Sequence, residues 1–468
     1  MRYPATLTIP ISLSRDAPRP LHEQVVAQVR TAIHDGLLAA GCQLPSSRTL
    51  AHLLGVSRGV VTVAYDELFT AGYLDSRAGS GTYVAARPRR DPEVTLAARP
   101  ASGPAEMIDL SPGQPNLEVF PLSAWRAAWR QASFRHPPAA GLPPLGLPEL
   151  RHAIATHLQR TWALALPNSV VVVTTGRWDG LRVLLGTLGV TAAQVAVEEP
   201  SSPSLRHLVG DGEVPGAAIP AGATGALPDP LPAACRAVVV SPDAPPSGEA
   251  MSAQRRQDLA RWAARTGGRI VELARDAAPS PGMGRLPRLI NLTRGRSILV
   301  GGFCELLTPS LKLGYVVVPG DLAGPVRARI LSQANQPSYT TQRAVAQLLG
   351  DGTVARLMRR LDAAAARKRR MVTSALAPVA GIRLDAPETL DMATVHLLDG
   401  APADRVADLL LARGVRVTTL APYHFSGLPV RSALVIGYGH QPDRTLGRAL
   451  STLVAVLTGP AMGCLRRG

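Results

Sequence analysis

Residues 45–73 read PSSRTLAHLLGVSRGVVTVAYDELFTAGY, and this stretch decides the fold of the N-terminal part of the chain. Ser46 or Ser47 precedes one apolar stripe and Ser57 precedes another, and serine is a preferred residue at a helix N-terminus. The stripes at helical spacing are Leu50, Leu53 and Leu54, then Val60, Val61, Ala64, Leu68 and Ala71. Gly55 lies in the short turn between them, so the stretch predicts a helix-turn-helix.

The flanking segments complete this domain. Residues 20–35 place Leu21, Val25, Val29 and Ile33 on one helical face. Downstream, residues 73–85 read YLDSRAGSGTYVA, which predicts a strand over 74–77, a glycine turn at 79–81 and a strand over 82–84. We therefore expect a winged helix-turn-helix over residues 14–86.

The composition indicates a basic protein of more than one domain. The chain has 468 residues and a formal net charge of +16. A surplus of this size favours a polyanionic partner such as double-stranded DNA, although a basic surface without a partner is the alternative. A chain of this length usually holds two or three domains. Only two of its 50 basic side chains are lysines, Lys312 and Lys368.

The sequence favours a cytoplasmic protein with no membrane partner. It contains no uncharged apolar run of about 18 residues, the length that a spanning helix needs. Its N-terminus, MRYPATLTIPISLSRD, lacks the layout of a signal peptide. The four cysteines are far apart, so we expect neither a metal site nor a disulfide framework.

The remainder of the chain predicts a tether followed by an α/β body. Residues 87–107 are rich in Pro, Ala and Arg and show no periodicity, which is typical of a linker. From Ile108 onward, buried-strand patterns alternate with helical ones, as in a mostly parallel sheet. The expected strands are 170–175, 195–200, 236–242, 268–273, 297–302 and 313–319. After about residue 385 the pattern shortens and predicts a smaller α+β lobe.

Residues 20–84 resemble the GntR family of bacterial regulators without a gap. The segments that carry the resemblance are PLHEQV, LPSSRTLA, GVSRGVV, YDEL, GYL and RAGSGTYV. The resemblance implies that Arg48, Ser57, Arg58, Gly59 and Thr62 lie near phosphates and base edges. It implies that the wing approaches the minor groove through Arg77, Gly79, Ser80 and Gly81. Arginine suits both grooves, because it binds guanine in a bidentate manner and is attracted to a narrow minor groove.

The body is similar to fold-type I aminotransferases, and the whole chain resembles the MocR branch of the GntR regulators. The segments concerned are FPLSAWRAAWR (120–130), LPELRHAIATHL (147–158), SPDAPPSGEAMSAQRRQDL (241–259), LLTPSLKLGYVVVP (306–319) and RLMRRLDAAAARKRR (356–370). The resemblance implies a large domain over 108–384, a small lobe over 385–468, a homodimer and an unknown small-molecule effector. The family cofactor is pyridoxal 5′-phosphate.

The residues for that cofactor are missing. The family's Schiff-base segment, Ser-Lys-x-Leu-x-Pro-x-x-Arg-x-Gly-Tyr, aligns with residues 304–315, which places Glu305 at the lysine position. A carboxylate cannot form an imine. In the same segment Cys304 replaces a phosphate-binding serine, and Lys312 replaces a phosphate-binding arginine, which loses the forked guanidinium.

Three further cofactor segments are also altered. The family segment that supplies a carboxylate for the pyridine nitrogen, Glu-Asp-Asp-Tyr-Asp, is Glu-Leu-Ala-Arg-Asp at 272–276, so this carboxylate and the phenol are both missing. The family's Pro-Thr-Tyr, whose tyrosine ring stacks on the cofactor, is Pro-Ser-Ser at 200–202. The third segment, a polar residue before Pro-Thr-Gly, corresponds to residues 243–248, which are one residue shorter. Covalent cofactor binding and transaminase activity are therefore expected to be lost, and no catalytic residue is assigned. Lys368 is expected on a solvated basic helix face, which argues against its replacing the lost lysine.

One anion-binding feature persists in the body. Thr175, Gly176 and Arg177 follow a strand and open a helix, a place where backbone N–H groups suit a phosphate or carboxylate. With Lys312 near by analogy, a non-covalent effector site is one interpretation, and a turn retained for packing is the other. Two alternatives remain for the whole protein. One is a regulator or aminotransferase that binds pyridoxal 5′-phosphate through a non-standard lysine, and the other is a DNA-tethering scaffold that does not regulate.

Overall fold

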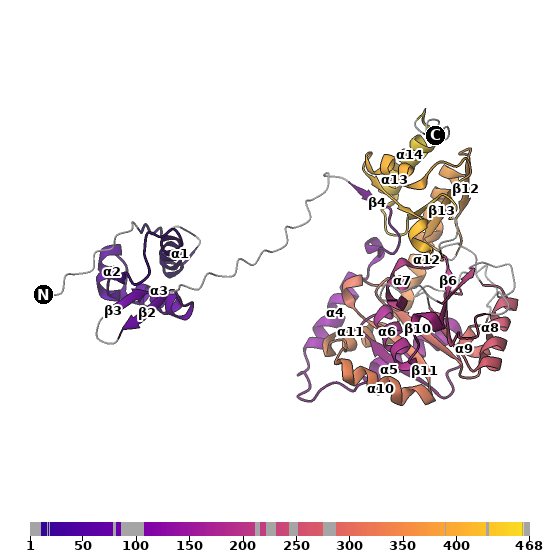
Figure 1. Ribbon diagram of the computed structural model, residues 1–468, viewed down its shortest axis with the longest axis horizontal. Helices are drawn as coiled ribbons and strands as arrows, with labels where there is room; N and C mark the ends of the chain where they lie inside the picture. Colours follow the sequence, from indigo (N-terminus) through magenta and orange to yellow (C-terminus); the bar gives the residue numbers. More distant parts are fainter. Residues whose placement is uncertain are drawn as a thin grey trace. The chain divides into compact units, whose positions relative to one another are not determined.

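The computed structural model describes residues 11–15, 17, 19–77, 81–85, 107–210, 216–220, 231–242, 251–274, 287–388, 390–426, 430–460 and 462. It divides into two compact units, residues 1–102 and 103–468 (Figure 1). Of the expected tether, only residue 107 is among the described residues, and Gly79 and Ser80 of the expected wing tip lie outside them. In the part of the chain that is described, no helix has the length and apolarity to cross a membrane.

The N-terminal unit is a winged helix-turn-helix, as expected. Its helices are α1 (Leu21–His34), α2 (Ser47–Leu54) and α3 (Arg58–Thr70), and its strands are β1 (Gln43–Leu44), β2 (Leu74–Arg77) and β3 (Gly81–Val84). The Ser46 hydroxyl accepts a hydrogen bond from the Thr49 N–H at 3.1 Å and so caps α2. Gly55 ends α2 with a left-handed φ of 63°. The three strands form one antiparallel sheet in the order β1-β3-β2.

The large domain is built on a seven-stranded sheet in the order β5-β11-β10-β9-β8-β6-β7. The strands are β5 (Ser169–Thr174), β6 (Val195–Glu199), β7 (Ala217–Pro220), β8 (Ala237–Val240), β9 (Arg269–Leu273), β10 (Ser297–Gly302) and β11 (Gly314–Pro319). All six strands expected from the sequence are present, and β7 is an addition. Within this sheet only β11 runs opposite to the other six strands, so the mostly parallel sheet is confirmed.

Helices cover both faces of this sheet. They are α4 (Leu122–Ser133), α5 (Pro148–Trp162), α6 (Arg177–Leu188), α7 (Pro203–Gly210), α8 (Ala253–Thr266), α9 (Leu289–Leu292), α10 (Gly320–Gln333), α11 (Tyr339–Gly350) and α12 (Thr353–Leu376). Alternate residues of β5 point to opposite faces: Val171 and Val173 pack in the core with α5 and α11, and Val172 packs with α6 and α10. The body also contains the 3₁₀ helices η1 (Leu117–Val119), η2 (Ala192–Gln194), η3 (Pro309–Leu311) and η4 (Ala421–Tyr423).

The small lobe has its own sheet in the order β12-β13-β16-β15. Its strands are β12 (Ile382–Asp385), β13 (Met392–Leu397), β14 (Val415–Arg416), β15 (Thr418–Thr419) and β16 (Ala433–Gly437), and its helices are α13 (Ala403–Leu411) and α14 (Asp443–Thr458). The lobe boundary expected between 384 and 385 falls inside β12, because this strand pairs with β13 over its whole length.

The start of the body also belongs to the small lobe rather than to the large domain. β4 (Ile108–Asp109) pairs in parallel with β14, and in Figure 1 it lies beside the small-lobe elements. Leu110 is fully buried in the small-lobe core, and its carbonyl accepts a hydrogen bond from the Gly437 N–H at 2.6 Å. The expected large domain over 108–384 is therefore corrected at both ends.

Candidate functional site

The first candidate surface is the outer side of α2 and α3. Val61, Ala64, Tyr65 and Leu68 of α3 are buried in the domain core. The Tyr65 hydroxyl donates a hydrogen bond to the Pro45 carbonyl at 2.8 Å, which fixes α3 against the residues that precede α2. Burial raises the pKa of Tyr65 above its usual value, so this hydroxyl stays a donor. All five residues expected on this surface are exposed: Arg48, Ser57, Arg58, Gly59 and Thr62.

The exposed residues of α3 make few contacts within the domain. The Arg58 Nε lies 3.5 Å from the Ser47 hydroxyl, a long hydrogen bond between the starts of α3 and α2. The Thr62 hydroxyl donates to the Arg58 carbonyl at 3.0 Å. Ser57 occupies the N-cap position of α3 but makes no side-chain cap. The helix therefore presents a positive N-terminal turn whose side chains are available to a partner.

The wing is described only at its base. Arg77 ends β2 and pairs with Gly81 at the start of β3. Gly81 has a φ of +122°, and a Cβ there would come within 2.8 Å of the Gln43 side chain on β1. The positive φ favours glycine and explains Gly81 without any contact to a partner, whereas the Gln43 amide is the end of a flexible side chain that could shift.

The second candidate site lies at the carboxyl edge of the large sheet. β5 and β10 run in the same direction because both are antiparallel to β11. The carboxyl ends of β5, β6, β8, β9 and β10 therefore share one edge, which is where open α/β sheets bind ligands. The segments that follow these strands include Thr175–Arg177 after β5, Pro200–Ser202 after β6 and Phe303–Glu305 after β10.

The turn between β5 and α6 is held by close backbone packing. Gly176 is the N-cap of α6 with a φ of +114°. Gly314 on β11 pairs with Thr174 on the adjacent strand β5. A Cβ on Gly314 would lie 2.5 Å from the carbonyl carbon of Gly176. A Cβ on Gly302 would lie 3.3 Å from the Arg177 nitrogen. Glycines on β10 and β11 therefore allow this turn to sit directly against the sheet.

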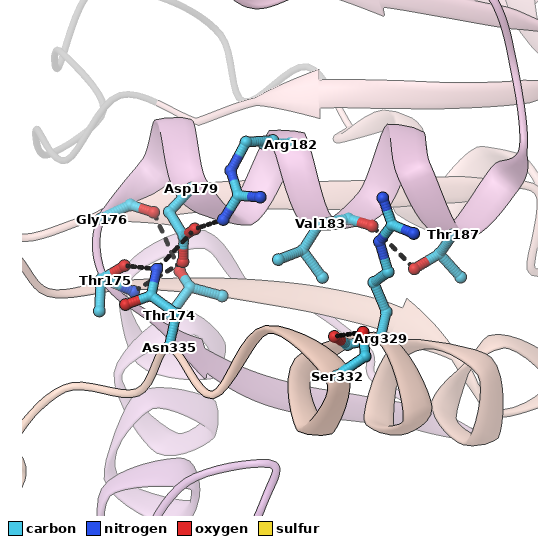
Figure 2. A network of polar contacts seen from close by, with 10 residues as sticks. All are labelled: Thr174, Thr175, Gly176, Asp179, Arg182, Val183, Thr187, Arg329, Ser332 and Asn335. Atoms are coloured by element: carbon cyan, nitrogen blue, oxygen red, sulfur yellow. Dashed lines mark hydrogen bonds and ion pairs between the residues drawn. The ribbon is translucent and has the colours of Figure 1, made fainter.

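Polar side chains complete the turn, as Figure 2 shows. The Asp179 carboxylate accepts hydrogen bonds from the Thr175 N–H at 3.2 Å and from Arg182 at 2.6 Å. Asn335, from the segment after α10, donates to the Thr175 hydroxyl at 2.9 Å and to Asp179 at 3.1 Å. An acid in the first turn satisfies donors at the helix N-terminus. The sequence assigned the backbone N–H groups of this turn to a bound anion, but Asp179 already accepts the hydrogen bond of one of them, the Thr175 N–H.

Arg177 and Glu305 meet at this edge. Their side chains form an ion pair with an N–O distance of 3.1 Å. The Glu305 side chain is 43 % exposed, so solvent or a ligand reaches it, whereas that of Arg177 is 15 % exposed. The sequence placed both residues at the site but did not predict that they pair.

The neighbouring residues of this segment are placed as follows. The Cys304 thiol donates to the Leu313 carbonyl at 3.6 Å. Lys312 follows η3 with a left-handed φ of 49°, and it is exposed. Lys312 lies two residues before β11, and β11 begins opposite Thr174, so the lysine lies at the same sheet edge as Thr175.

The end of β9 carries no carboxylate toward this edge among the described residues. Ala274, which follows β9, is buried. Glu272 within β9 is fully buried, and it pairs with Arg288 at 3.0 Å. The Arg288 guanidinium in turn lies 4.0 Å from the centre of the Trp162 ring. Residues 275 and 276 lie outside the described part of the chain.

Sequence reasoning missed a junction between the two lobes. The Glu199 carboxylate, at the end of β6, accepts hydrogen bonds from the N–H groups of Phe425 and Ser426. His424 lies 3.6 Å from the same oxygen. Burial alone would raise the pKa of Glu199, but the hydrogen bonds from Ser426 and Phe425 and the nearby His424 outweigh it and lower the pKa. A charged Glu199 therefore joins the sheet edge to the segment after η4.

Lys368 is not solvated, which corrects the expectation from its basic surroundings. Its side chain is fully buried on α12, and the ammonium donates to Glu118 at 3.2 Å and to the Gly439 carbonyl at 2.9 Å. The run ARKRR suggested an exposed face, but helical spacing turns this one position inward toward the small lobe. The lysine joins η1 to the segment after β16.

Comparisons with known proteins match the N-terminal domain by itself and also nearly the whole chain. Residues 21–84 match the model of the family described as bacterial regulatory proteins, gntR family. The chain is 33 % identical to the HTH-type pyridoxine biosynthesis transcriptional regulator PdxR of Corynebacterium glutamicum, covering 95 % of this chain and 98 % of that protein. It is 30 % identical to the probable rhizopine catabolism regulatory protein MocR of Rhizobium meliloti, covering 75 % of this chain and 76 % of that protein.

Solved structures share the fold of the body. The multiple substrate aminotransferase of Thermococcus profundus aligns with a TM-score of 0.68 at 18 % identity, covering 77 % of this chain and 93 % of that one. The kynurenine aminotransferase of Pyrococcus horikoshii aligns with a TM-score of 0.67 at 18 % identity, covering 75 % and 91 %. Both confirm the fold-type I architecture expected from the sequence.

Proposed function

Because this chain belongs to the GntR family of bacterial transcriptional regulators, in the MocR-type branch with an aminotransferase-like body, we propose that it binds an operator through its N-terminal domain. The second part of the proposal is that the body senses a small molecule and forms no covalent bond to pyridoxal 5′-phosphate. The observation that carries the second part is Glu305, an exposed carboxylate paired with Arg177 where the family has the Schiff-base lysine.

The operator-binding residues are Arg48, Ser57, Arg58, Gly59 and Thr62, together with Arg77, Gly79, Ser80 and Gly81 of the wing. Support for the first five comes from their exposure on α2 and α3 beside a buried core face. The N-terminal residues of the second helix of a helix-turn-helix contact base edges in the major groove. A DNA partner also implies that the protein works in the cytoplasm.

The site does not fit pyridoxal 5′-phosphate as a covalent cofactor. An imine needs an amine, and Glu305 supplies a carboxylate. Electron withdrawal by the pyridine ring needs an acidic partner for its nitrogen, and the segment after β9 offers the buried methyl group of Ala274. Lys368 is occupied by Glu118 and the Gly439 carbonyl. Lys312 is the remaining amine, and it is the one that the alternative hypothesis requires.

The effector site consists of Thr175, Gly176, Arg177 and Lys312. Arg177 and Lys312 supply positive charge at the sheet edge, and the start of α6 supplies backbone N–H groups. A phosphate or carboxylate bound there competes with Glu305 for Arg177. The name of the relative PdxR refers to pyridoxine biosynthesis, so vitamin B6 compounds are the first ligands to test.

Absorbance spectroscopy with borohydride reduction tests the loss of covalent chemistry. Full-length protein is mixed with pyridoxal 5′-phosphate, reduced, digested and analysed by mass spectrometry. We expect no stoichiometric adduct on any lysine peptide, and tight binding, if present, to reverse on dialysis. A stoichiometric adduct on Lys312 that disappears in Lys312→Ala would establish the alternative, a regulator or aminotransferase using a non-standard lysine.

We further propose that the protein acts as a homodimer whose two DNA-binding domains read two half-sites. Support comes from the aminotransferase-like fold, an argument by analogy. Sedimentation of the full-length chain should give twice the monomer mass. A footprint with two half-sites and altered reporter transcription would separate a regulator from a scaffold that only tethers.

A further inference from the structure

The outer row of α3 contains an apolar side chain that the domain does not use. With about 3.6 residues per turn, the row opposite the buried Val61, Ala64 and Leu68 contains Gly59 and Val63. Val63 is 49 % exposed, and among the described residues of this unit it shares this property only with Leu37 and Leu53. It lies one helical turn beyond Gly59, in the part of the helix that a helix-turn-helix inserts into the major groove.

The neighbours of Val63 leave its isopropyl group accessible. Gly59 has no side chain, and a Cβ there would meet only the Ser57 hydroxyl, at 3.8 Å. The hydroxyl proton of Thr62 is donated to the Arg58 carbonyl, so this donor is not offered to a base. The methyl group of Thr62 has no such partner. Gly59, Thr62 and Val63 therefore form a mainly apolar surface, named here the apolar row.

The charges on α3 restrict how the apolar row meets DNA. Arg58 is at the first position of the helix, whereas Asp66 and Glu67 are exposed in its second half. Phosphates attract the arginine and repel the two carboxylates. The N-terminal half, which ends near Val63, is therefore the half that enters the groove.

We propose that Val63 determines specificity by packing against the C5-methyl group of a thymine in the operator, with the methyl group of Thr62 beside it. The thymine methyl is the apolar group that base pairs present in the major groove, and apolar side chains read it by contact. This inference rests on the proposed function, because it assumes that α3 reads the operator. Burial of one such methyl group corresponds to about a fourfold gain in affinity.

The test is a double-mutant cycle between protein and base. An operator is first selected from random duplexes with the full-length protein. Each thymine of a half-site is then replaced by deoxyuridine, which removes only the methyl group, and Kd is measured by fluorescence anisotropy. The wild-type protein should lose about fourfold in affinity at one or two thymines. Val63→Ala should bind the thymine duplex more weakly and lose the sensitivity at one of these positions.

Two further variants sharpen the result. Thr62→Ser keeps the hydroxyl and removes the methyl group, so it should reduce the sensitivity at the same or the adjacent thymine. Leu37→Ala is the matched control, because Leu37 is 64 % exposed in the turn after α1 and lies outside α2 and α3. It should keep the wild-type pattern. Val63→Ala should fold normally, since alanine has the higher helix propensity.

The outcomes distinguish this inference from the function on which it rests. If Val63→Ala keeps the wild-type sensitivity at every thymine, or if the wild-type protein is insensitive to every methyl group, the assignment of Val63 is wrong. If the wild-type protein selects no sequence and binds all duplexes equally, the proposed operator binding itself is wrong.

Discussion

Replacement of Arg58 by alanine should separate DNA binding from folding. The side chain is exposed at the first position of α3, and its hydrogen bond to Ser47 is long, at 3.5 Å. A positive charge at a helix N-terminus is unfavourable by about 0.3–1 kcal/mol. Its removal, together with the high helix propensity of alanine, should leave the domain as stable as before or slightly more stable.

The effect on operator binding should have the opposite sign and be larger. Loss of a bidentate arginine contact to guanine costs about 1–3 kcal/mol, which is roughly 5- to 150-fold in Kd. If Arg58 instead contacts a phosphate, affinity for all sequences falls together and the slope of log K against log salt becomes shallower by about 0.9. The two outcomes therefore identify the kind of contact.

Fluorescence anisotropy over a range of salt concentrations measures both quantities, on the selected operator and on a scrambled duplex. Arg19→Ala is the control, because Arg19 is exposed just before α1 and lies outside α2 and α3. Far-UV circular dichroism confirms that each variant is folded. An Arg58→Ala protein with wild-type affinity, specificity and salt slope would refute the placement of α3 in the major groove.

Three other perturbations test separate parts of the structure. Gly59→Ala should stabilise α3 by about 0.5–1 kcal/mol, since its Cβ meets no clash, yet weaken operator binding; slower amide exchange in α3 with unchanged Kd would contradict a close approach of DNA at this position. Glu305→Lys should give a borohydride-trapped adduct with pyridoxal 5′-phosphate at position 305. It should not transaminate, because Ala274 still supplies no carboxylate for the pyridine nitrogen. Turnover of any amino acid would show that the site is less altered than we infer. Burial lowers the pKa of His157 from 6.5 to about 4, so the unfolded chain binds more protons than the folded chain between these pH values. Stability should therefore fall as pH falls from about 6.5 toward 4. Thermal unfolding of His157→Asn should show a smaller pH dependence than the wild type, and identical pH profiles would exclude this histidine as the cause.

Local patterns were sufficient to predict much of the fold. The serine caps, the apolar stripes and Gly55 specify α2 and α3 through interactions within a few residues, and Ser46 caps α2 as expected. The buried strands of the large sheet were found because each is a continuous apolar run between helical segments. β7 was missed because its four residues, Ala217–Pro220, are too short and too weakly apolar to stand out.

Contacts between distant segments were not predictable. Lys368 belongs to a run of basic residues, which by itself indicates an exposed face. The residue is internal because the fold brings Glu118, which is 250 positions away in the sequence, to its ammonium group. The same holds for Asn335, which reaches Thr175 from 160 positions away. Position 305 was assigned by alignment with a family segment, but its ion pair with Arg177 depends on how the ends of β5 and β10 meet.

The first strand of the body has a mechanical consequence. Ile108 and Asp109 pair with Val415 and Arg416, Arg416 also forms an ion pair with Asp109 at 3.3 Å, and the side chains of His440 and Gln441 both hydrogen-bond the Asp109 carbonyl. The first described residues of the body are thus fastened to the small lobe. A movement of that lobe would therefore carry Ile108 and Asp109 with it.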